Sequence, residues 1–167
     1  MEVEAAHDSP DGLDSLVAPR TLAIVCRGKR YEVTTKQVSI SSVWSAALSS
    51  DANAAELPFE LNQDEKENGI AHGEAVLQLV IDFLRYHEGK APEIPAKPLR
   101  SKNMHEVLKD PWDAEFITKV SNRHLYLIIH FANRLGIDSL LHIACARTAS
   151  LIKGVPLERM RDALAVV

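Results

Sequence analysis

Two cysteines and seven histidines are the residues of this sequence best suited to supply a nucleophile, a general base or metal ligands. Cys145 ends the apolar run 141–145, inside a predicted helix, where a thiol usually packs against its neighbours. His142 precedes Cys145 by three residues, which makes half of a zinc site, but no second pair has the spacing of metal ligands. The proximity of Cys26 or Cys145 to a histidine in the folded chain stays open. Because the P-loop, dinucleotide-binding and zinc-hydrolase motifs are also missing, we expect no catalytic residue, metal ion or cofactor.

Composition narrows the classes of partner and the compartment. The formal net charge is -4 and the basic residues are scattered, which argues against direct binding of nucleic acid. The N-terminus is acidic, unlike a secretory signal, and no apolar run reaches the length that crosses a bilayer, so we expect no membrane partner. Few cysteines in a chain of one-domain size favour a reducing compartment, the cytoplasm or the nucleus.

The first half of the chain predicts a flexible tail followed by a small sheet and helices. Residues 1–19 are acidic, contain proline and lack an apolar period, which predicts a flexible N-terminal tail. Two apolar runs, 22–26 and 29–33, flank the pair Arg27-Gly28, which predicts a β-hairpin. A helical turn and a longer helix capped by Ser41 or Ser42 follow, and 57–59 is at best an edge strand because it contains proline.

The second half predicts helices separated by one long excursion. A largely buried helix is expected over 75–87. Residues 88–110 are rich in proline and basic residues, which is typical of a solvated linker or, alternatively, of a docking loop. Helices over 124–135 and 140–153, the second capped by Asp138 or Ser139, precede a third that Pro156 opens. The final helix carries an apolar stripe that packs either on the preceding helix or on a partner: Leu157, Met160, Ala163, Leu164 and Val167.

Several segments, in order along the chain, resemble the Skp family of SCF ubiquitin-ligase adaptors. Residues 111–116 (PWDAEF) resemble the family's WDxEF segment, and 132–137 (ANRLGI) its AANYLDI segment. Leu140-Leu141 with Cys145, and then 151–154 (LIKG), resemble its GLLDxTC and MIKG stretch. The hairpin around Arg27-Gly28 and the segment 75–87 agree as well. Elongin C is similar in its core but ends near the position of Ile137.

The resemblance implies an α+β fold: a BTB/POZ core, a small sheet flanked by helices, followed by Skp-type helices. The domains would be the tail 1–19, the core 20–137 with a flexible loop at 88–110, and truncated F-box-binding helices at 138–167. The implied function is a non-catalytic adaptor that links a cullin scaffold to F-box substrate receptors.

The resemblance also implies two sets of binding residues. Asn133 and Arg134 occupy the family's cullin-facing Asn-Tyr pair. Because a charge replaces the tyrosine, we expect a compensating acid on the cullin. The F-box-facing positions are Leu141, Cys145, Leu151, Ile152, Met160 and Leu164. The family continues into an acidic tail that covers the F-box, whereas this chain ends at Val167, so we expect weakened binding or a cover supplied by the partner.

Two alternatives stay open alongside the adaptor. One is a Skp-like structural scaffold in a chromosome-associated or cytoskeletal assembly outside the ubiquitin pathway, which the arginine at position 134 and the short C-terminus favour. The other is a BTB homodimer, whereas a Skp-like adaptor is expected to be a monomer or a weak homodimer when it is unbound.

Overall fold

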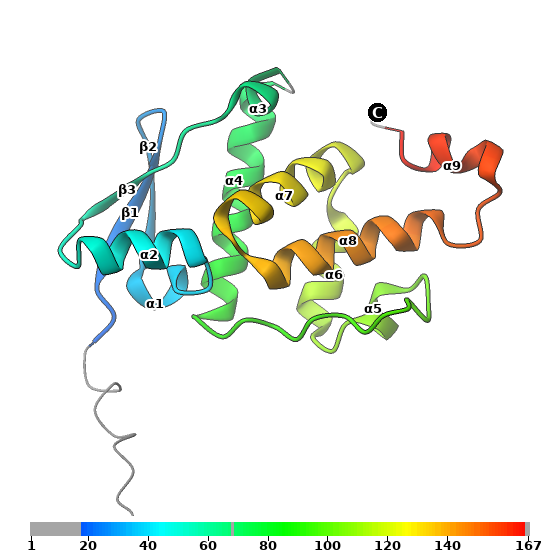
Figure 1. The fold of residues 1–167 in the computed structure, drawn as a ribbon, viewed down its shortest axis with the longest axis horizontal. Coiled ribbons are helices and arrows are strands. Elements are labelled where there is room, and N and C mark those ends of the chain that lie inside the picture. The colour runs from blue at the N-terminus through cyan, green and yellow to red at the C-terminus, as the bar shows by residue number, and fades with distance from the viewer. Residues whose placement is uncertain (1–17, 68, 166–167) are drawn as a thin grey trace, which may run out of the picture.

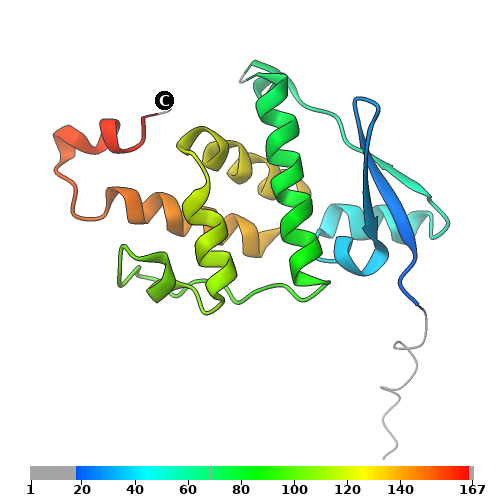
Figure 2. The ribbon, with the colours of Figure 1, turned by 180° about the vertical axis from the view of Figure 1, so that it is seen from behind.

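The computed structural model describes residues 18–67 and 69–165. The predicted flexible tail 1–19 lies outside the described residues except for its last two positions, and so does Val167 of the predicted apolar stripe. A sheet lies at one end of the molecule and the last helix at the other, with the long helices between them (Figures 1 and 2).

The sheet has three strands in the order β2-β1-β3. Strands β1 (Thr21–Cys26) and β2 (Lys29–Thr34) pair in an antiparallel register that sets Cys26 opposite Lys29. Arg27 and Gly28 form the two-residue turn with φ values of 51° and 82°, which a hairpin turn of this length requires, so the predicted hairpin is confirmed. Strand β3 (Glu56–Pro58) pairs in parallel with β1 as an edge strand, which agrees with the proline at Pro58.

Two short helices connect the hairpin to β3. Helix α1 (Thr35–Val38) begins at a capping box in which the side chains of Thr34 and Gln37 bond each other's backbone N–H groups. Helix α2 (Ser42–Ser50) is capped by Ser41, as predicted. The hydroxyl of Ser41 also donates to the carbonyl of Leu135, 2.6 Å away, and so ties this part of the chain to a helix almost a hundred residues later.

The centre of the molecule is helix α4 (Ile70–His87), which follows the short helix α3 (Gln63–Glu67). Predicted over 75–87, α4 begins five residues earlier, at Ile70. One face of α4 packs on the sheet side and another on the helices that follow it. The buried apolar residues of α4 are Val76, Leu77, Val80, Ile81, Phe83 and Leu84.

The region 88–110, predicted as a linker, is irregular up to Asn103 and then forms helix α5 (Met104–Val107). Helix α6 (Pro111–Lys119) follows, capped by Asp110 and with Pro111 at its first position. No helix was predicted for the PWDAEF motif, because the nine residues of α6 are too few to show a clear apolar period. The structure gives the motif a packing role: Asp113 bonds the ring of His87 in α4 at 2.8 Å, with both groups buried, and Trp112 stacks on Tyr86.

Three helices complete the chain: α7 (Asn122–Leu135), α8 (Asp138–Ile152) and α9 (Leu157–Ala163). Gly136 ends α7 at φ 61°, and a Cβ there would lie 1.9 Å from the hydroxyl of Ser42, so only glycine fits. The predicted capping of α8 by Asp138 or Ser139 is wrong. Both residues lie inside the helix, Ile137 takes the cap position, and no side chain caps it.

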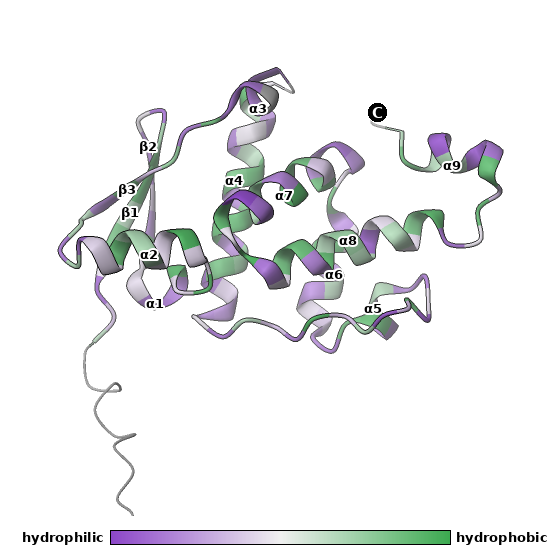
Figure 3. Cartoon of the chain, in the orientation of Figure 1, coloured by the Kyte–Doolittle hydropathy of each residue, from purple (hydrophilic) through white to green (hydrophobic). Residues whose placement is uncertain are grey.

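One hydrophobic core runs from β1 to α8, and hydrophobic segments gather where α4, α7 and α8 lie together, whereas α9 is more hydrophilic (Figure 3). The predicted α+β class, a small sheet with flanking helices followed by C-terminal helices, is confirmed. The division of the chain at residue 137 stays a prediction. Of the helices in the described ranges, none is both long and apolar enough to cross a membrane.

Candidate protein-interaction surfaces

The two cullin-facing candidates lie at the C-terminal end of α7. Asn133 is exposed, and Arg134 borders a depression of about 360 Å³ between α2, β3 and α7. We call this depression the Arg134 surface. Its lining is mainly apolar and aromatic: Val43, Trp44, Ala47, Leu57, Pro58, Phe59, Glu60, Arg134 and Leu135.

The side chain of Arg134 is held inside the chain by three kinds of contact. Its Nη1 donates to Glu65 Oε2 at 2.9 Å, and its Nη2 donates to the carbonyl of Glu60 at 2.7 Å. The guanidinium also lies over the ring of Phe59, 4.2 Å from the centroid. Arginine suits this position because its planar fork donates to two oxygens while its face stacks on an aromatic ring. Only 32% of the side chain is exposed, so Arg134 is part of the wall of this surface.

Glu65 is the counter-ion of Arg134 and is itself fixed by the start of α3. Its Oε2 accepts from the backbone N–H of Asn62 at 2.7 Å, and the side chain of Asn62 accepts from the N–H of Glu65 at 2.9 Å. This reciprocal pair is a capping box that turns the carboxylate inward. The Glu65 side chain is only 1% exposed. The acid expected on a partner of Arg134 is therefore present in the chain itself, 69 residues away in sequence.

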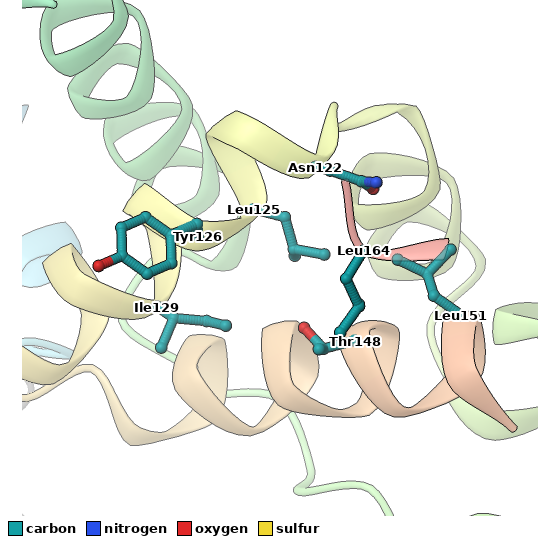
Figure 4. Close-up of a pocket in the computed structure, with 7 residues that line it drawn as sticks. All are labelled: Asn122, Leu125, Tyr126, Ile129, Thr148, Leu151 and Leu164. Atoms are coloured by element: carbon teal, nitrogen blue, oxygen red, sulfur yellow. The ribbon is translucent and has the colours of Figure 1, made fainter. Parts of the chain in front are cut away.

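A second depression, of about 160 Å³, lies between α7, α8 and α9, and we call it the C-terminal groove (Figure 4). The side chains of Leu125, Thr148 and Leu164 point into the same space. Asn122 closes one end, because its side-chain amide donates to the carbonyl of Ala163, the last residue of α9, and to that of Ala165 just after it. The complete lining is Asn122, Leu125, Tyr126, Ile129, Thr148, Leu151 and Leu164.

The structure brings only some of the F-box-facing candidates together. Leu151 and Leu164 line the C-terminal groove. Met160 and Ile152 are half-buried close to it in sequence, on α9 and at the end of α8, and Leu141 is half-buried against the core. The residues that α7 contributes to the C-terminal groove were not predicted. Tyr126 and Ile129 could have indicated them, because they are three residues apart and lie off the face that α7 buries in the core.

Cys145 lies apart from these residues. The prediction that its thiol packs in a helix interior is wrong: Cys145 is exposed. Helix α8 buries Ile143 and Ala144, and the next position turns outward toward the segment 95–99. His142 and Cys145 line one depression against this segment, but the Nδ1 of His142 bonds the carbonyl of Asp138, so among the described residues no acid orients its ring as a base for the thiol.

The other thiol is unsuited to nucleophilic chemistry for a different reason. Cys26 is fully buried at the end of β1, and this burial raises the pKa of its thiol above the ordinary value. Within the described ranges, no group of three or more His, Cys, Asp or Glu side chains is placed to hold a metal ion.

A three-stranded sheet flanked by helices, extended by a helical array and carrying two exposed apolar surfaces, defines an α+β protein with the features of a protein-interaction module. The chain is 37% identical over 86 residues to an S-phase kinase-associated protein 1 homolog of Tetrahymena thermophila, covering 52% of this chain and 51% of that protein. It is 34% identical over 88 residues to the E3 ubiquitin ligase complex SCF subunit sconC of Arthroderma otae, covering 53% and 52%.

The corresponding subunit of Aspergillus flavus is 33% identical over 88 residues, covering 53% of each chain. The matched segment therefore spans about half the length of the curated relatives. No protein-family model matches the chain. The similarity to named Skp proteins and SCF subunits confirms the resemblance to the Skp family that the sequence motifs indicated.

Proposed function

We propose that this protein is a non-catalytic, Skp-like adaptor of an SCF-type E3 ubiquitin ligase, which joins a cullin scaffold to F-box substrate receptors. The observation that carries this proposal is that a single helix, α7, contributes to both exposed apolar surfaces. Asn122, Tyr126 and Ile129 line the C-terminal groove, and Arg134 lines the other surface. Relatives named as SCF subunits support the same assignment.

The geometry of α7 suits an adaptor that works by holding two proteins at a fixed separation. Asn122 and Arg134 are twelve residues apart on one helix, which corresponds to roughly 18 Å along its axis. The helix packs on both α4 and α8, and its apolar face is buried, so the two surfaces move as one body. An adaptor of this kind transfers no proton and no chemical group. It fixes the position of the substrate receptor relative to the catalytic part of the ligase.

The Arg134 surface is the proposed cullin face. Because Glu65 neutralises Arg134 internally, the cullin does not have to supply an acid, which revises the expectation drawn from the sequence. The exposed parts of the surface are instead Val43, Ala47 and the edge of β3 around Pro58. We propose that apolar contact with these residues replaces the aromatic contact of the family's tyrosine.

The C-terminal groove is the proposed F-box face. Leu151 and Leu164 line it, and Leu157 on α9 is 79% exposed, the most exposed large hydrophobic residue in the described part of the chain. A single exposed leucine is common on protein surfaces, so the groove, which several apolar side chains line together, carries this assignment. The cytoplasm or the nucleus, where such a ligase would act, is the proposed location.

The test is affinity purification of the tagged chain from its own cells, with mass spectrometry of the co-purified proteins. Val43→Glu places a charge on the proposed cullin face without touching Arg134, and Leu164→Asp does the same in the C-terminal groove. Ile94→Glu is the matched control, because Ile94 is 48% exposed, Val43 is 47% exposed, and Ile94 lies on neither surface.

We expect the first variant to lose cullin, the second to lose F-box proteins, and the control to keep both. If the unaltered chain recovers neither class, the ubiquitin-pathway function is wrong and a structural scaffold takes its place. Recovery mainly of a second copy of the chain would instead indicate the homodimer.

A further inference from the structure

A third depression, of about 260 Å³, lies between α8 and the irregular segment that follows α4, and we call it the loop groove. Its floor is apolar, made by Pro95, Ala96 and Leu99 of the segment and by Ala146 and Ala149 of α8. Pro95 is buried, although it belongs to a region without helix or strand. Lys153, at the end of α8, holds the segment in place by donating from its Nζ to the carbonyl of Leu99 at 2.9 Å.

Basic side chains lie in and next to the loop groove, and we call them its basic rim: Lys97 lines the groove, Lys153 bonds the segment at Leu99, and Arg100 and Lys102 follow in the same segment. Lys97, Arg100, Lys102 and Lys153 are all exposed, and none forms an ion pair with another described residue. Glu93, an acid of the same segment, is paired with Lys109. Four cations without an ion pair among the described residues, three of them within six positions of the sequence, contrast with the net charge of -4 for the whole chain.

The partial negative charge at the C-terminal end of α8 compensates only part of this positive charge. The C-terminus of a helix carries about half a negative charge, which favours nearby cations such as Lys153 and Lys102. Half a charge leaves most of the four positive charges without compensation. The cluster therefore suits an anionic ligand that also has an apolar part to fill the floor.

We propose that the loop groove binds a short acidic peptide segment of a partner protein, with one apolar side chain on the floor and carboxylates at the basic rim. A peptide fits better than nucleic acid, because His142 is the one aromatic ring in the lining, and tracking a single strand takes several rings on which successive bases stack. Thr148 and Leu151 line the C-terminal groove from other positions on α8, so both grooves can be occupied together. This inference does not depend on the proposed adaptor function.

Cys145 supplies a local readout, because its exposed thiol lines the loop groove and the other cysteine, Cys26, is fully buried. The experiment measures the rate at which iodoacetamide alkylates Cys145 in the folded chain, by intact mass, with increasing amounts of synthetic peptide. The probes are short peptides with a single Leu, Ile, Met or Phe flanked by glutamates. Matched peptides carry serine in place of the apolar residue or lysine in place of glutamate.

We expect the acidic apolar peptides to slow alkylation, and the serine and lysine peptides to have little effect. The variant Lys97→Glu/Arg100→Glu should weaken peptide binding about tenfold or more, since it reverses two rim charges. The control Lys29→Glu/Lys66→Glu makes the same change in net charge at exposed positions away from the groove and should bind as the unaltered chain does. Ala149→Leu, which fills the floor without changing charge, should also abolish protection.

The proposal is overturned if no acidic apolar peptide protects Cys145. It is equally overturned if the serine peptides protect as well as the apolar ones, because the floor then takes no part. Protection by a single-stranded oligouridylate and not by the peptides would make this a nucleic-acid site instead. None of these outcomes bears on cullin or F-box binding, which the purification experiment tests separately.

Discussion

Arg134 in α7 donates to the buried carboxylate of Glu65 in α3 at 2.9 Å, and this pair closes one wall of the proposed cullin face. The pair explains why a charge can stand where the Skp family has an aromatic residue. The guanidinium covers Phe59 as a ring would, and its charge is balanced inside the chain. The partner then meets a surface that is mostly apolar.

The first prediction concerns the stability of this pair. Arg134→Met removes the donor and leaves Glu65 buried without its counter-ion, which should lower the free energy of unfolding by about 1–3 kcal/mol. Arg134→Lys keeps the charge but loses the planar fork, so it should fall between Met and the unaltered chain. Chemical denaturation measures both.

A double-mutant cycle isolates the interaction itself. Combining Arg134→Met with Glu65→Gln removes both charges, so the double variant should be less destabilised than the sum of the two single variants. Additive losses would show that the two side chains contribute independently and that the contact does not couple α3 to α7.

The second prediction concerns the bond between His87 and Asp113, which joins α4 to α6. Both side chains are almost fully buried and their polar atoms are 2.8 Å apart. Asp113→Ala leaves a ring nitrogen of His87 buried without a partner and should cost about 1–3 kcal/mol in unfolding free energy. Asp113→Asn keeps an acceptor and should cost less.

Glu115→Ala is the control on the same helix, because its carboxylate is exposed and forms an ion pair with the exposed Lys119. Exposed pairs of this kind contribute little to stability, because both charges are well solvated whether or not they are paired. An Asp113→Ala variant no less stable than this control would remove the structural explanation of the PWDAEF motif.

The third prediction is a loss of stability in mild acid. Burial lowers the pKa of His124 from its ordinary 6.5, and the neighbouring His72 and Arg123 lower it further. His124 Nε2 is 3.0 Å from His72 Nδ1, and Arg123 donates to the other nitrogen of His72. The folded protein therefore binds protons at His124 less readily than the unfolded chain does.

Because the unfolded chain binds more protons as the pH falls below 6.5, stability should decline there and level off below the lowered pKa of the folded state. Thermal unfolding followed from neutral to mildly acidic pH measures this decline. The variant His124→Gln should flatten it, whereas His105→Gln, at an exposed position, should not. If the stability of His124→Gln declines by the same amount, the decline is caused by other titratable groups.

The fourth prediction is that the two cysteines differ in reactivity. Cys145 is exposed, whereas Cys26 is fully buried and its pKa is raised by that burial, so little thiolate forms and no reagent reaches it. Alkylation of the folded chain should add one label, at Cys145, and a second label should appear only in denaturant. Equal rates at both sites in the folded state would contradict the burial of Cys26.

Local features of the sequence were enough to determine much of the framework. Arg27-Gly28 predicted the hairpin because a two-residue turn needs positive φ, and Ser41 predicted the start of α2 because its hydroxyl caps the first turn. The motifs that resemble the Skp family are also sequence properties, and the comparisons agree with them. Leu151 and Leu164 were predicted together and line one groove.

Tertiary structure alone decided the features that depend on residues far apart in the chain. Arg134 and Glu65 are 69 positions apart, so no local pattern could reveal that the charge already has a partner. The apolar run before Cys145 suggested a buried thiol. The exposure of a helical position, however, depends on which faces of the helix the neighbouring elements cover. Here α8 turns Cys145 toward the segment 95–99 and leaves it exposed. Conformational preference is local to a few residues, whereas burial and charge pairing are set by the packing of distant elements.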